Sequence, residues 1–126
     1  MQNQMNKYRR LKNLFLRQSY LDAWEDYQRS ILKKSFPKWD YIVLTASNEE
    51  QGKAFQKQIE YRSEKGVLPD ATKFLVIPDP DGKRIGSGGA TLHVLRTLSE
   101  REGFLGDFYG KRILVIHSGG DSKRVP

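Results

Sequence analysis

Residues 41–50 read YIVLTASNEE, a run of apolar and β-branched side chains that ends in four polar ones. A run such as YIVLTA is typical of a strand buried on both faces of a sheet. The SNEE that follows predicts a helix start, because Ser47 and Glu50 have capping-box spacing and acidic side chains are favourable at a helix N-terminus. The stretch therefore indicates a β–α unit, and we expect its helix to run to Lys65, where Gly66 is a stop signal.

The same alternation continues along the chain. FLVI at 74–77 and ILVI at 113–116 predict two further buried strands, and a leucine-bearing pattern from Thr91 to about Arg101, with Gly103 beyond it, predicts a helix between them. Strands that alternate with helices favour βαβ units and a parallel sheet. The predicted fold class for residues 38–126 is therefore α/β, with a Rossmann-like three-layer parallel sheet.

Residues 1–37 form a separate N-terminal helical segment in this prediction. Apolar residues recur at three- and four-residue steps, a helical period: Leu11, Leu14, Phe15, Tyr20, Trp24, Tyr27 and Ile31. Ser19 and Asp22 are placed to cap a second helix, so we expect two helical segments with a break near Gln18. Pro37 ends the segment.

Composition limits the possible functions. The chain has 126 residues, enough for one modest domain, and no cysteine, which excludes disulfides, thiolate metal sites and a cysteine nucleophile. It has no apolar run long enough to span a membrane, and we expect a cytoplasmic protein.

The formal net charge of +7 is concentrated at the N-terminus. Residues 1–21 contain no acidic side chain and five basic ones, which are Lys7, Arg9, Arg10, Lys12 and Arg17. We interpret this as a solvated helix face. The alternative is a non-catalytic binding module whose basic helix contacts nucleic acid or an acidic partner. A nucleic-acid partner is the less favoured of these readings.

Four glycines occur in DPDGKRIGSGGATL, at 79–92. Asp79 to Gly82 fit a type I turn. Glycines just before a helix let backbone N–H groups approach a ligand, and the helix N-terminus favours an anion such as phosphate. The candidate contacts are Gly86, Ser87, Gly88, Gly89 and Thr91, with Lys83 and Arg84 as counter-charges. The segment is not a P-loop, and the alternative is a tight turn whose glycines serve packing.

A second glycine pair follows the last predicted strand, in HSGGDSKRVP. Gly119 and Gly120 leave that strand directly, and Lys123 and Arg124 come within five residues. A guanidinium can bridge phosphate oxygens in bidentate fashion. The carboxyl ends of parallel strands share one sheet edge, where such folds bind ligands, so both glycine segments are expected there. The alternative is a basic loop.

The remaining polar candidates are weaker. His93 is expected to be a packed or surface side chain, whereas His117 follows a strand and is a candidate to face the site. Asp79, Asp81 and Asp121 are candidate Mg²⁺ ligands, although for Asp79 and Asp81 a role in turn formation is preferred. No His or carboxylate spacing predicts a zinc site.

Three stretches, WDYIVLTASNEEQ, DPDGKRIGSGGATL and ILVIHSGGDSKRVP, occur in this order. Together they resemble the N-terminal part of the fucose-1-phosphate guanylyltransferase (GDP-fucose pyrophosphorylase) and L-fucokinase family. The resemblance covers about residues 38–126. It implies a fold of the sugar nucleotidyltransferase type, with GTP and a sugar 1-phosphate as substrates and Mg²⁺ as cofactor.

The resemblance also implies roles for particular residues. The glycine-rich signature of sugar nucleotidyltransferases reads roughly G-G-x-G-T-R; Gly119, Gly120 and Arg124 match it, whereas Ser122 and Lys123 replace the Gly-Thr pair. Gly119, Gly120 and Ser122 would hold the triphosphate together with residues 86–91. Arg124 and Lys123 would be the catalytic cationic clamps.

Relatives in this family continue beyond the second glycine segment with further catalytic residues and, in some members, a kinase domain. We therefore expect the α/β domain to be incomplete in this chain. We also expect the C-terminal portion of the parent enzyme to be a necessary partner, and the chain alone to be inactive.

Overall fold

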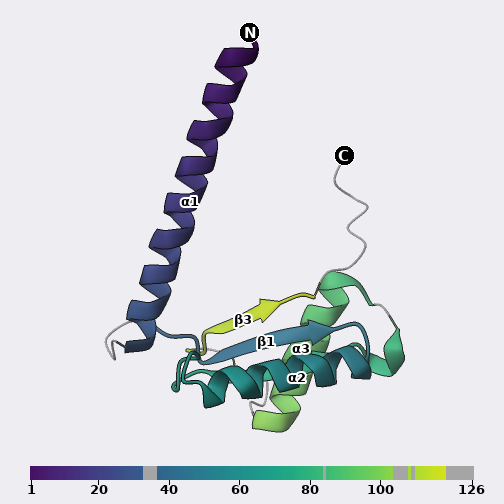
Figure 1. Ribbon diagram of the computed structural model, residues 1–126. Coiled ribbons are helices and arrows are strands. Elements are labelled where there is room, and N and C mark those ends of the chain that lie inside the picture. Colours follow the sequence, from purple (N-terminus) through teal and green to yellow (C-terminus); the bar gives the residue numbers. More distant parts are fainter. Residues whose placement is uncertain (33–36, 84, 104–107, 109, 119–126) are drawn as a thin grey trace. The chain divides into compact units, whose positions relative to one another are not determined.

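The computed structural model describes residues 1–32, 37–83, 85–103, 108 and 110–118. The chain divides into two units, Met1–Pro37 and Lys38–Pro126, which are described separately below. Figure 1 labels the helices and strands of both.

The first unit contains one helix, α1 (Gln2–Leu32), so the predicted break near Gln18 is wrong. Ser19 does not cap a second helix, because its hydroxyl donates to the Phe15 carbonyl one turn earlier, at 2.9 Å. The Gln18 amide donates to Asp22 at 2.9 Å along the same helix. The helix is continuous, but its apolar residues change sides along it. Leu11 and Phe15 lie on one side and the apolar residues of 20–31 lie on another, and this change produced the pattern that predicted a break.

The second unit alternates strands and helices as predicted. Its elements are β1 (Tyr41–Ala46), α2 (Glu49–Glu64), β2 (Lys73–Pro78), the 3₁₀ turn η1 (Pro80–Gly82), α3 (Gly86–Glu102) and β3 (Ile113–Ile116). The strands form a parallel sheet in the order β2-β1-β3, with Tyr41 opposite both Lys73 and Ile113. The three strand predictions are therefore confirmed. Strand β1 is the central strand, since it pairs with β2 on one side and with β3 on the other.

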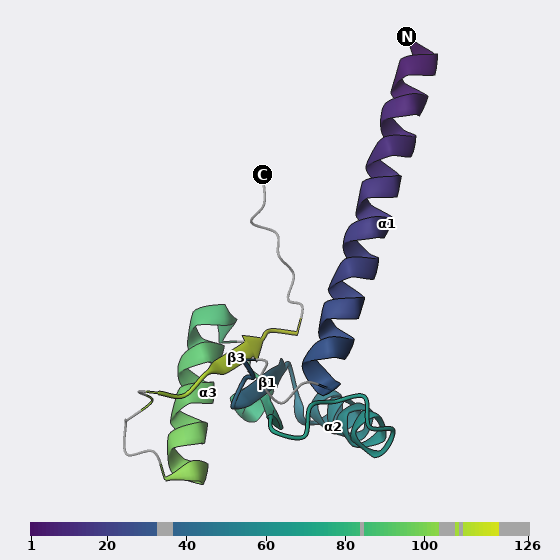
Figure 2. The same ribbon diagram turned by 90° about the vertical axis from the view of Figure 1, so that its left-hand side faces the viewer.

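The two helices cover opposite faces of this sheet (Figure 2). On one face the buried residues Tyr41, Val43, Ile77, Val94 and Leu98 form the core between the strands and α3. On the other face α2 packs on β1 and β2. The resulting helix–sheet–helix layering confirms a Rossmann-like α/β fold, and the order of the strands makes it doubly wound.

Gly52 is the buried residue of α2 where the helix packs on the sheet. A β-carbon built there would lie 3.7–3.8 Å from side-chain atoms of Ala46, Val76 and Pro78, which is ordinary van der Waals contact. The helix ends as expected: Lys65 is the C-cap, and Gly66 follows in the left-handed region with φ of 67°.

The start of α2 differs by one residue from the prediction. Asn48 is the N-cap, and its side chain accepts a hydrogen bond from the Gln51 amide at 2.8 Å. The Gln51 side chain in turn accepts from the Ser47 backbone N–H at 2.7 Å. The predicted pair of Ser47 and Glu50 is therefore replaced by Asn48 and Gln51, which have the same spacing. Asparagine is an N-cap at least as good as serine, so local propensity did not separate the two.

The first glycine segment also differs from the prediction. The turn runs from Pro80 to Lys83, whose backbone N–H donates to the Pro80 carbonyl at 3.1 Å, and Asp81 has a left-handed φ of 54°. It is therefore not a type I turn beginning at Asp79. The helix begins at Gly86 and not near Thr91, so the predicted contact glycines form its first turn. Glycine has low helix propensity, which is why the sequence pattern placed the start too late.

Candidate functional site

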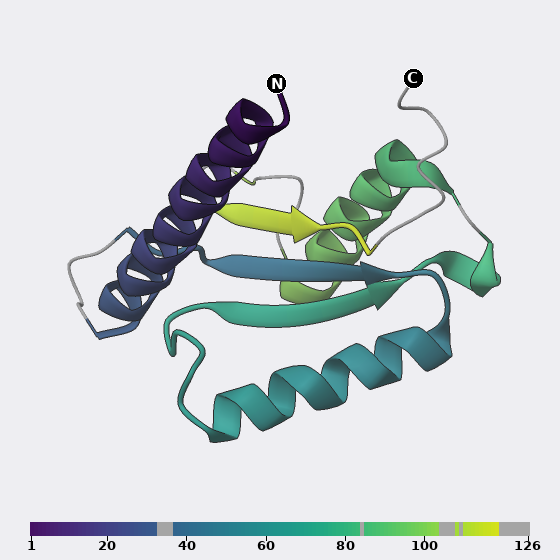
Figure 3. The same cartoon turned by 45° about the horizontal axis from the view of Figure 1, so that its top comes forward.

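The carboxyl ends of the three strands lie at one edge of the sheet, where α2 and α3 begin (Figure 3). This arrangement follows from the parallel β-α-β connections, which return each helix start to the same edge. Ser47 follows β1, η1 follows β2, and His117 and Ser118 follow β3. Both glycine-rich segments therefore start from this edge, although residues 119–126 of the second lie outside the described residues.

The N-terminus of α2 is unfavourable for an anion. The Asn48 side chain accepts from the Gln51 amide, and the first turn carries Glu49 and Glu50. These carboxylates stabilise the positive end of the helix dipole and would repel a phosphate group. The α2 start therefore serves to stabilise the helix.

The N-terminus of α3 has the opposite character. Ile85 occupies the N-cap position and its apolar side chain makes no capping hydrogen bond, so we call this helix start uncapped; its first turn has no acidic residue. Gly86, Ser87 and Gly88 are exposed. Because the first amide groups of a helix have no intrahelical partner, they are available here to an anionic ligand.

The three glycines of this turn have different structural causes. Gly86 has a left-handed φ of 74°, which only glycine adopts without strain. At Gly89 a β-carbon would lie 3.0 Å from the Ile85 β-carbon, so close packing favours glycine. Gly88 has neither constraint, since it has no left-handed φ and a β-carbon there would meet open space. Its lack of a side chain leaves the backbone of the first turn accessible from solvent.

Hydrogen bonds join the two glycine segments at their bases. The imidazole of His117 lies 3.1 Å, measured from Nε2, from the Thr91 hydroxyl oxygen and 3.5 Å, measured from Nδ1, from that of Thr45. The Thr91 hydroxyl donates to the Ser87 carbonyl at 2.8 Å. His117, a weak candidate in the sequence, is thus brought beside one of the predicted nucleotide contacts. The hydrogen-bonding capacity of Thr91 is largely used within the protein, so its contact with a nucleotide stays a prediction.

Two residues of this edge were missed by sequence reasoning. Thr45, which is buried, accepts a hydrogen bond from the Ser118 backbone N–H at 3.2 Å. The side-chain oxygen of Gln51 accepts from the Ser47 hydroxyl at 3.0 Å and, more weakly, from the Ser118 hydroxyl at 3.4 Å. The available signal for Thr45 was a single polar residue at the end of an otherwise apolar strand.

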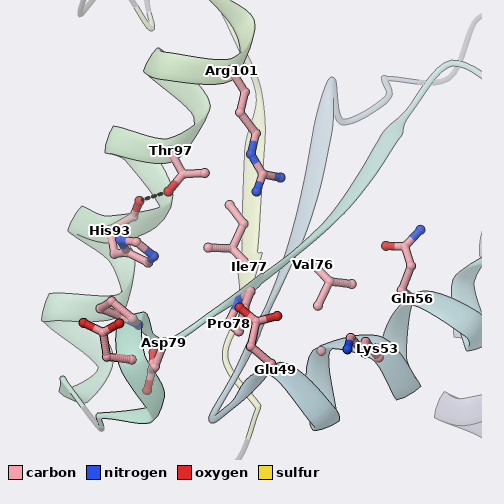
Figure 4. A pocket seen from close by; sticks show the side chains of 13 residues that line it. Glu49, Lys53, Gln56, Val76, Ile77, Pro78, Asp79, His93, Thr97 and Arg101 are labelled. Atoms are coloured by element: carbon pink, nitrogen blue, oxygen red, sulfur yellow. Dashed lines mark hydrogen bonds between the residues drawn. The ribbon is translucent and has the colours of Figure 1, made fainter.

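An open groove of about 490 Å³ lies beside the edge strand β2, between α2 and α3 (Figure 4). Glu49 and Lys53 lie on its α2 side, and His93, Thr97 and Arg101 lie on its α3 side. His93 is half-buried there and its carbonyl accepts from the Thr97 hydroxyl at 2.8 Å. Its placement agrees with the expectation of a packed or surface side chain.

Carboxylates do not build a metal site by themselves in the described residues. Asp79 and Asp81 line the same groove as Glu49, yet within the described part of the chain no three His, Asp or Glu side chains converge closely enough to hold a metal ion. Mg²⁺ bound through nucleotide phosphates needs only one or two protein carboxylates, and its binding here stays a prediction. Asp121 lies outside the described residues.

Of the predicted cations, Lys83 is described and is exposed three residues before α3. Arg84, Lys123 and Arg124 lie outside the described residues, as do Gly119, Gly120 and Ser122. In the helices that the structure describes, none combines the length and apolarity needed to cross a membrane.

These features define the class of the second unit: a parallel, doubly wound α/β domain with an uncapped helix N-terminus at the carboxyl edge of its sheet. Comparison with curated proteins then gives the family. The chain is 40% identical over 108 residues to the bifunctional fucokinase/GDP-fucose pyrophosphorylase of Arabidopsis thaliana, a match that covers 71% of this chain and 10% of that protein.

Two mammalian proteins match as well. The chain is 40% identical over 89 residues to the fucose-1-phosphate guanylyltransferase of Mus musculus and 39% identical over 89 residues to that of Homo sapiens. These matches cover 70% of this chain and 15% and 14% of the two enzymes. The resemblance of this chain to the fucose-1-phosphate guanylyltransferase and fucokinase family is therefore confirmed over about 70% of its length. The chain spans only 10–15% of the length of these relatives. No family profile and no solved structure matches it.

Proposed function

We propose that this chain supplies part of the nucleotide-binding edge of an enzyme that forms GDP-fucose from GTP and fucose 1-phosphate. The observation that carries the proposal is the uncapped, acid-free N-terminus of α3, which lies at the carboxyl edge of the sheet. The relatives support the choice of substrates, since two of them are named fucose-1-phosphate guanylyltransferases. The remaining part of the active site would come from the rest of the parent enzyme, in the cytoplasm.

The proposed reaction is an in-line attack by a phosphate oxygen of fucose 1-phosphate on the α-phosphorus of GTP. The new P–O bond forms as the bond to the β-phosphate oxygen breaks, and pyrophosphate leaves. Catalysis of such a transfer is mainly positioning and electrostatic stabilisation. Mg²⁺, when bound with GTP, would neutralise part of the phosphate charge.

Each predicted residue has a role in this scheme. The backbone amides of Gly86, Ser87, Gly88 and Gly89 would donate to phosphate oxygens, with Thr91 close by and Lys83 as counter-charge. Gly119, Gly120 and Ser122 would hold the other side of the triphosphate. Arg124 and Lys123 would stabilise the charge that develops on the phosphates as pyrophosphate departs.

A titration of the whole chain with GTP, with and without Mg²⁺, tests this proposal. In ¹H–¹⁵N NMR spectra the amide signals of residues 86–89 should shift on binding. Replacement of one cation beside the site, Lys83→Ala, should weaken GTP binding by about fivefold, the effect of roughly 1 kcal/mol.

Lys57→Ala is the matched control, because Lys57 is also an exposed lysine but lies on α2 outside the edge described here. It should leave GTP affinity unchanged. The proposal fails if GTP at millimolar concentration shifts no signal of residues 86–89, or if the two lysine variants lose affinity equally.

A further inference from the structure

The imidazole of His117 occupies the junction between the end of β3 and the first turns of α3. Its Nε2 atom lies 3.1 Å from the Thr91 hydroxyl oxygen, and its Nδ1 atom lies 3.5 Å from the Thr45 hydroxyl oxygen. The ring thus contacts side chains from two different elements, one in α3 and one in β1. The residue after it, Ser118, is the last described residue before the glycine pair.

The hydrogen bonds determine which nitrogen carries the proton. The Thr91 hydroxyl hydrogen is directed to the Ser87 carbonyl at 2.8 Å, and a carbonyl can only accept. The Thr91 oxygen must therefore accept from His117, which requires a hydrogen on Nε2. In a neutral imidazole Nδ1 is then an acceptor, and the Thr45 hydroxyl can donate to it. Thr45 meanwhile accepts from the Ser118 backbone N–H at 3.2 Å. One tautomer satisfies the whole chain of donors and acceptors.

This chain runs from one glycine segment to the other: from the Ser118 amide through Thr45 and His117 to Thr91, and then to the Ser87 carbonyl. Ser118 also meets the Gln51 side chain at 3.4 Å, and Gln51 belongs to the cap of α2. The base of the second glycine segment is therefore held to the starts of both helices.

We infer that His117, as the neutral Nε2–H tautomer, is a positioning residue that holds the first turns of α3 against the end of β1 and the chain that leaves β3 at Ser118. It need not touch the nucleotide. Its consequence for function rests on the proposed function above, since the two segments it joins are the expected phosphate-binding elements. Its structural content, the tautomer and its hydrogen bonds, stands independently of any ligand.

The tautomer can be measured in the full chain without nucleotide. Two-bond ¹H–¹⁵N correlation spectra of the imidazole groups, recorded at alkaline pH, distinguish Nε2–H from Nδ1–H. His117 should show the Nε2–H pattern. The other histidine of the chain, His93, serves as the internal comparison. Thr91→Val removes the acceptor and should shift the His117 signals towards a mixture of tautomers, whereas Thr91→Ser keeps the hydroxyl and should preserve the pattern.

GTP affinity tests the positioning role. His117→Gln places an amide nitrogen near the position of Nε2 and should retain most of the affinity, whereas His117→Leu removes the donor and should lower it by up to about tenfold, the effect of one lost hydrogen bond. Lys57→Ala again serves as the unaffected control.

The outcomes separate the two proposals. An Nδ1–H pattern for His117, or identical spectra in the wild type and Thr91→Val, overturns the inference whether or not GTP binds. Equal GTP affinities of His117→Gln and His117→Leu overturn the positioning role. If GTP does not bind the wild-type chain but the Nε2–H pattern is present, the proposed function fails at this chain and the structural part of the inference is upheld.

Discussion

Gly88 differs from Gly86 and Gly89, because nothing in the described part of the chain requires it to lack a side chain. Gly86 needs its left-handed backbone and Gly89 needs space beside Ile85, whereas a β-carbon at position 88 would point into open space. A glycine in a helix costs about 0.5–1 kcal/mol relative to alanine. An exposed glycine leaves room for a ligand to approach the backbone, as the proposed phosphate site requires.

Gly88→Ala should therefore raise the stability of the chain by up to about 1 kcal/mol, because it removes backbone entropy from the unfolded state. The same change should weaken GTP binding, because the new methyl group stands where a phosphate would approach the backbone amides. Chemical denaturation and GTP titration of one preparation measure both effects.

Gly86→Ala provides the contrast at the same helix start. Alanine at φ of 74° is strained, so this variant should lose about 1–2 kcal/mol of stability. A result in which Gly88→Ala is as destabilising as Gly86→Ala, or in which Gly88→Ala binds GTP normally, would contradict the separation of roles made here.

At the scale of elements, the N-termini of α2 and α3 at the sheet edge differ in electrostatic character. Asn48, Glu49 and Glu50 complete the N-terminus of α2 from within the chain, whereas α3 begins with glycines and no cap. Orphan amide groups at a helix start must find some partner, whether protein, water or ligand. Of the two helix starts, as far as the described residues show, the one at α3 leaves that role open to a ligand.

Helix α1 is continuous although its apolar stripe changes sides, so a break should appear only if one is introduced. Ser19→Pro removes a backbone donor and places a ring against the preceding turn, at a cost of about 3 kcal/mol or more in a helix interior. We expect a clear loss of helicity by far-UV circular dichroism.

Asn3→Pro is the matched control, since position 3 lies in the first turn of α1, where proline is tolerated. Helicity should be retained in that variant. If Ser19→Pro and Asn3→Pro behave alike, the chain near residue 19 is not an uninterrupted helix. Contact of α1 with nucleic acid or an acidic partner stays a prediction from its charge.

At the scale of the whole α/β unit, a cluster at the amino edge of the sheet joins three elements. Glu102 at the end of α3 pairs with the Lys73 ammonium group at the start of β2 and accepts from the Tyr41 hydroxyl, at the start of β1, at 3.3 Å. The hydrogen bond from Lys73 holds the pKa of Glu102 below its ordinary value, although partial burial opposes this shift. Burial, followed by the neighbouring Glu102, raises the pKa of Tyr41. The cluster is therefore charged at Glu102 and Lys73 and neutral at Tyr41 near neutral pH.

A lowered carboxyl pKa in the folded state contributes stability above the unfolded pKa, which is about 4.3 for glutamate, and loses it as the pH falls through the folded pKa. Glu102→Gln should accordingly lower the melting temperature by a few degrees near neutral pH. The difference from the wild type should shrink progressively as the solution is acidified below about pH 4.

Glu100→Gln tests whether this effect needs the tertiary cluster. Glu100 pairs with Arg96 along α3, at 2.9 Å and with both side chains largely exposed, so this pair should contribute little. Thermal unfolding of both variants over a pH series gives the comparison. Equal and pH-independent effects would show that the Lys73–Glu102–Tyr41 cluster is not a source of stability.

The local pattern of the sequence was sufficient for the class of fold. YIVLTA, FLVI and ILVI each became a strand of one parallel sheet, and Gly66 and Gly103 each follow a helix end with left-handed φ. These features depend on residues close together in the chain, where apolar periodicity and backbone preference act directly. The family resemblance likewise depended on short stretches in a given order, and both the stretches and their order can be read directly from the sequence.

The arrangement of the candidate site was decided by tertiary structure. Thr45, Thr91 and His117 are separated by 26 to 72 residues along the chain and meet only because parallel strands bring their carboxyl ends to one edge. Tertiary structure also decided which helix start is capped. It likewise decided which glycine could carry a side chain without a clash, because both depend on the neighbouring residues in space. The sequence by itself determined that glycine-rich segments follow two strands. Packing decided that the first segment forms the uncapped start of α3, and that His117 joins this helix to the base of the second segment.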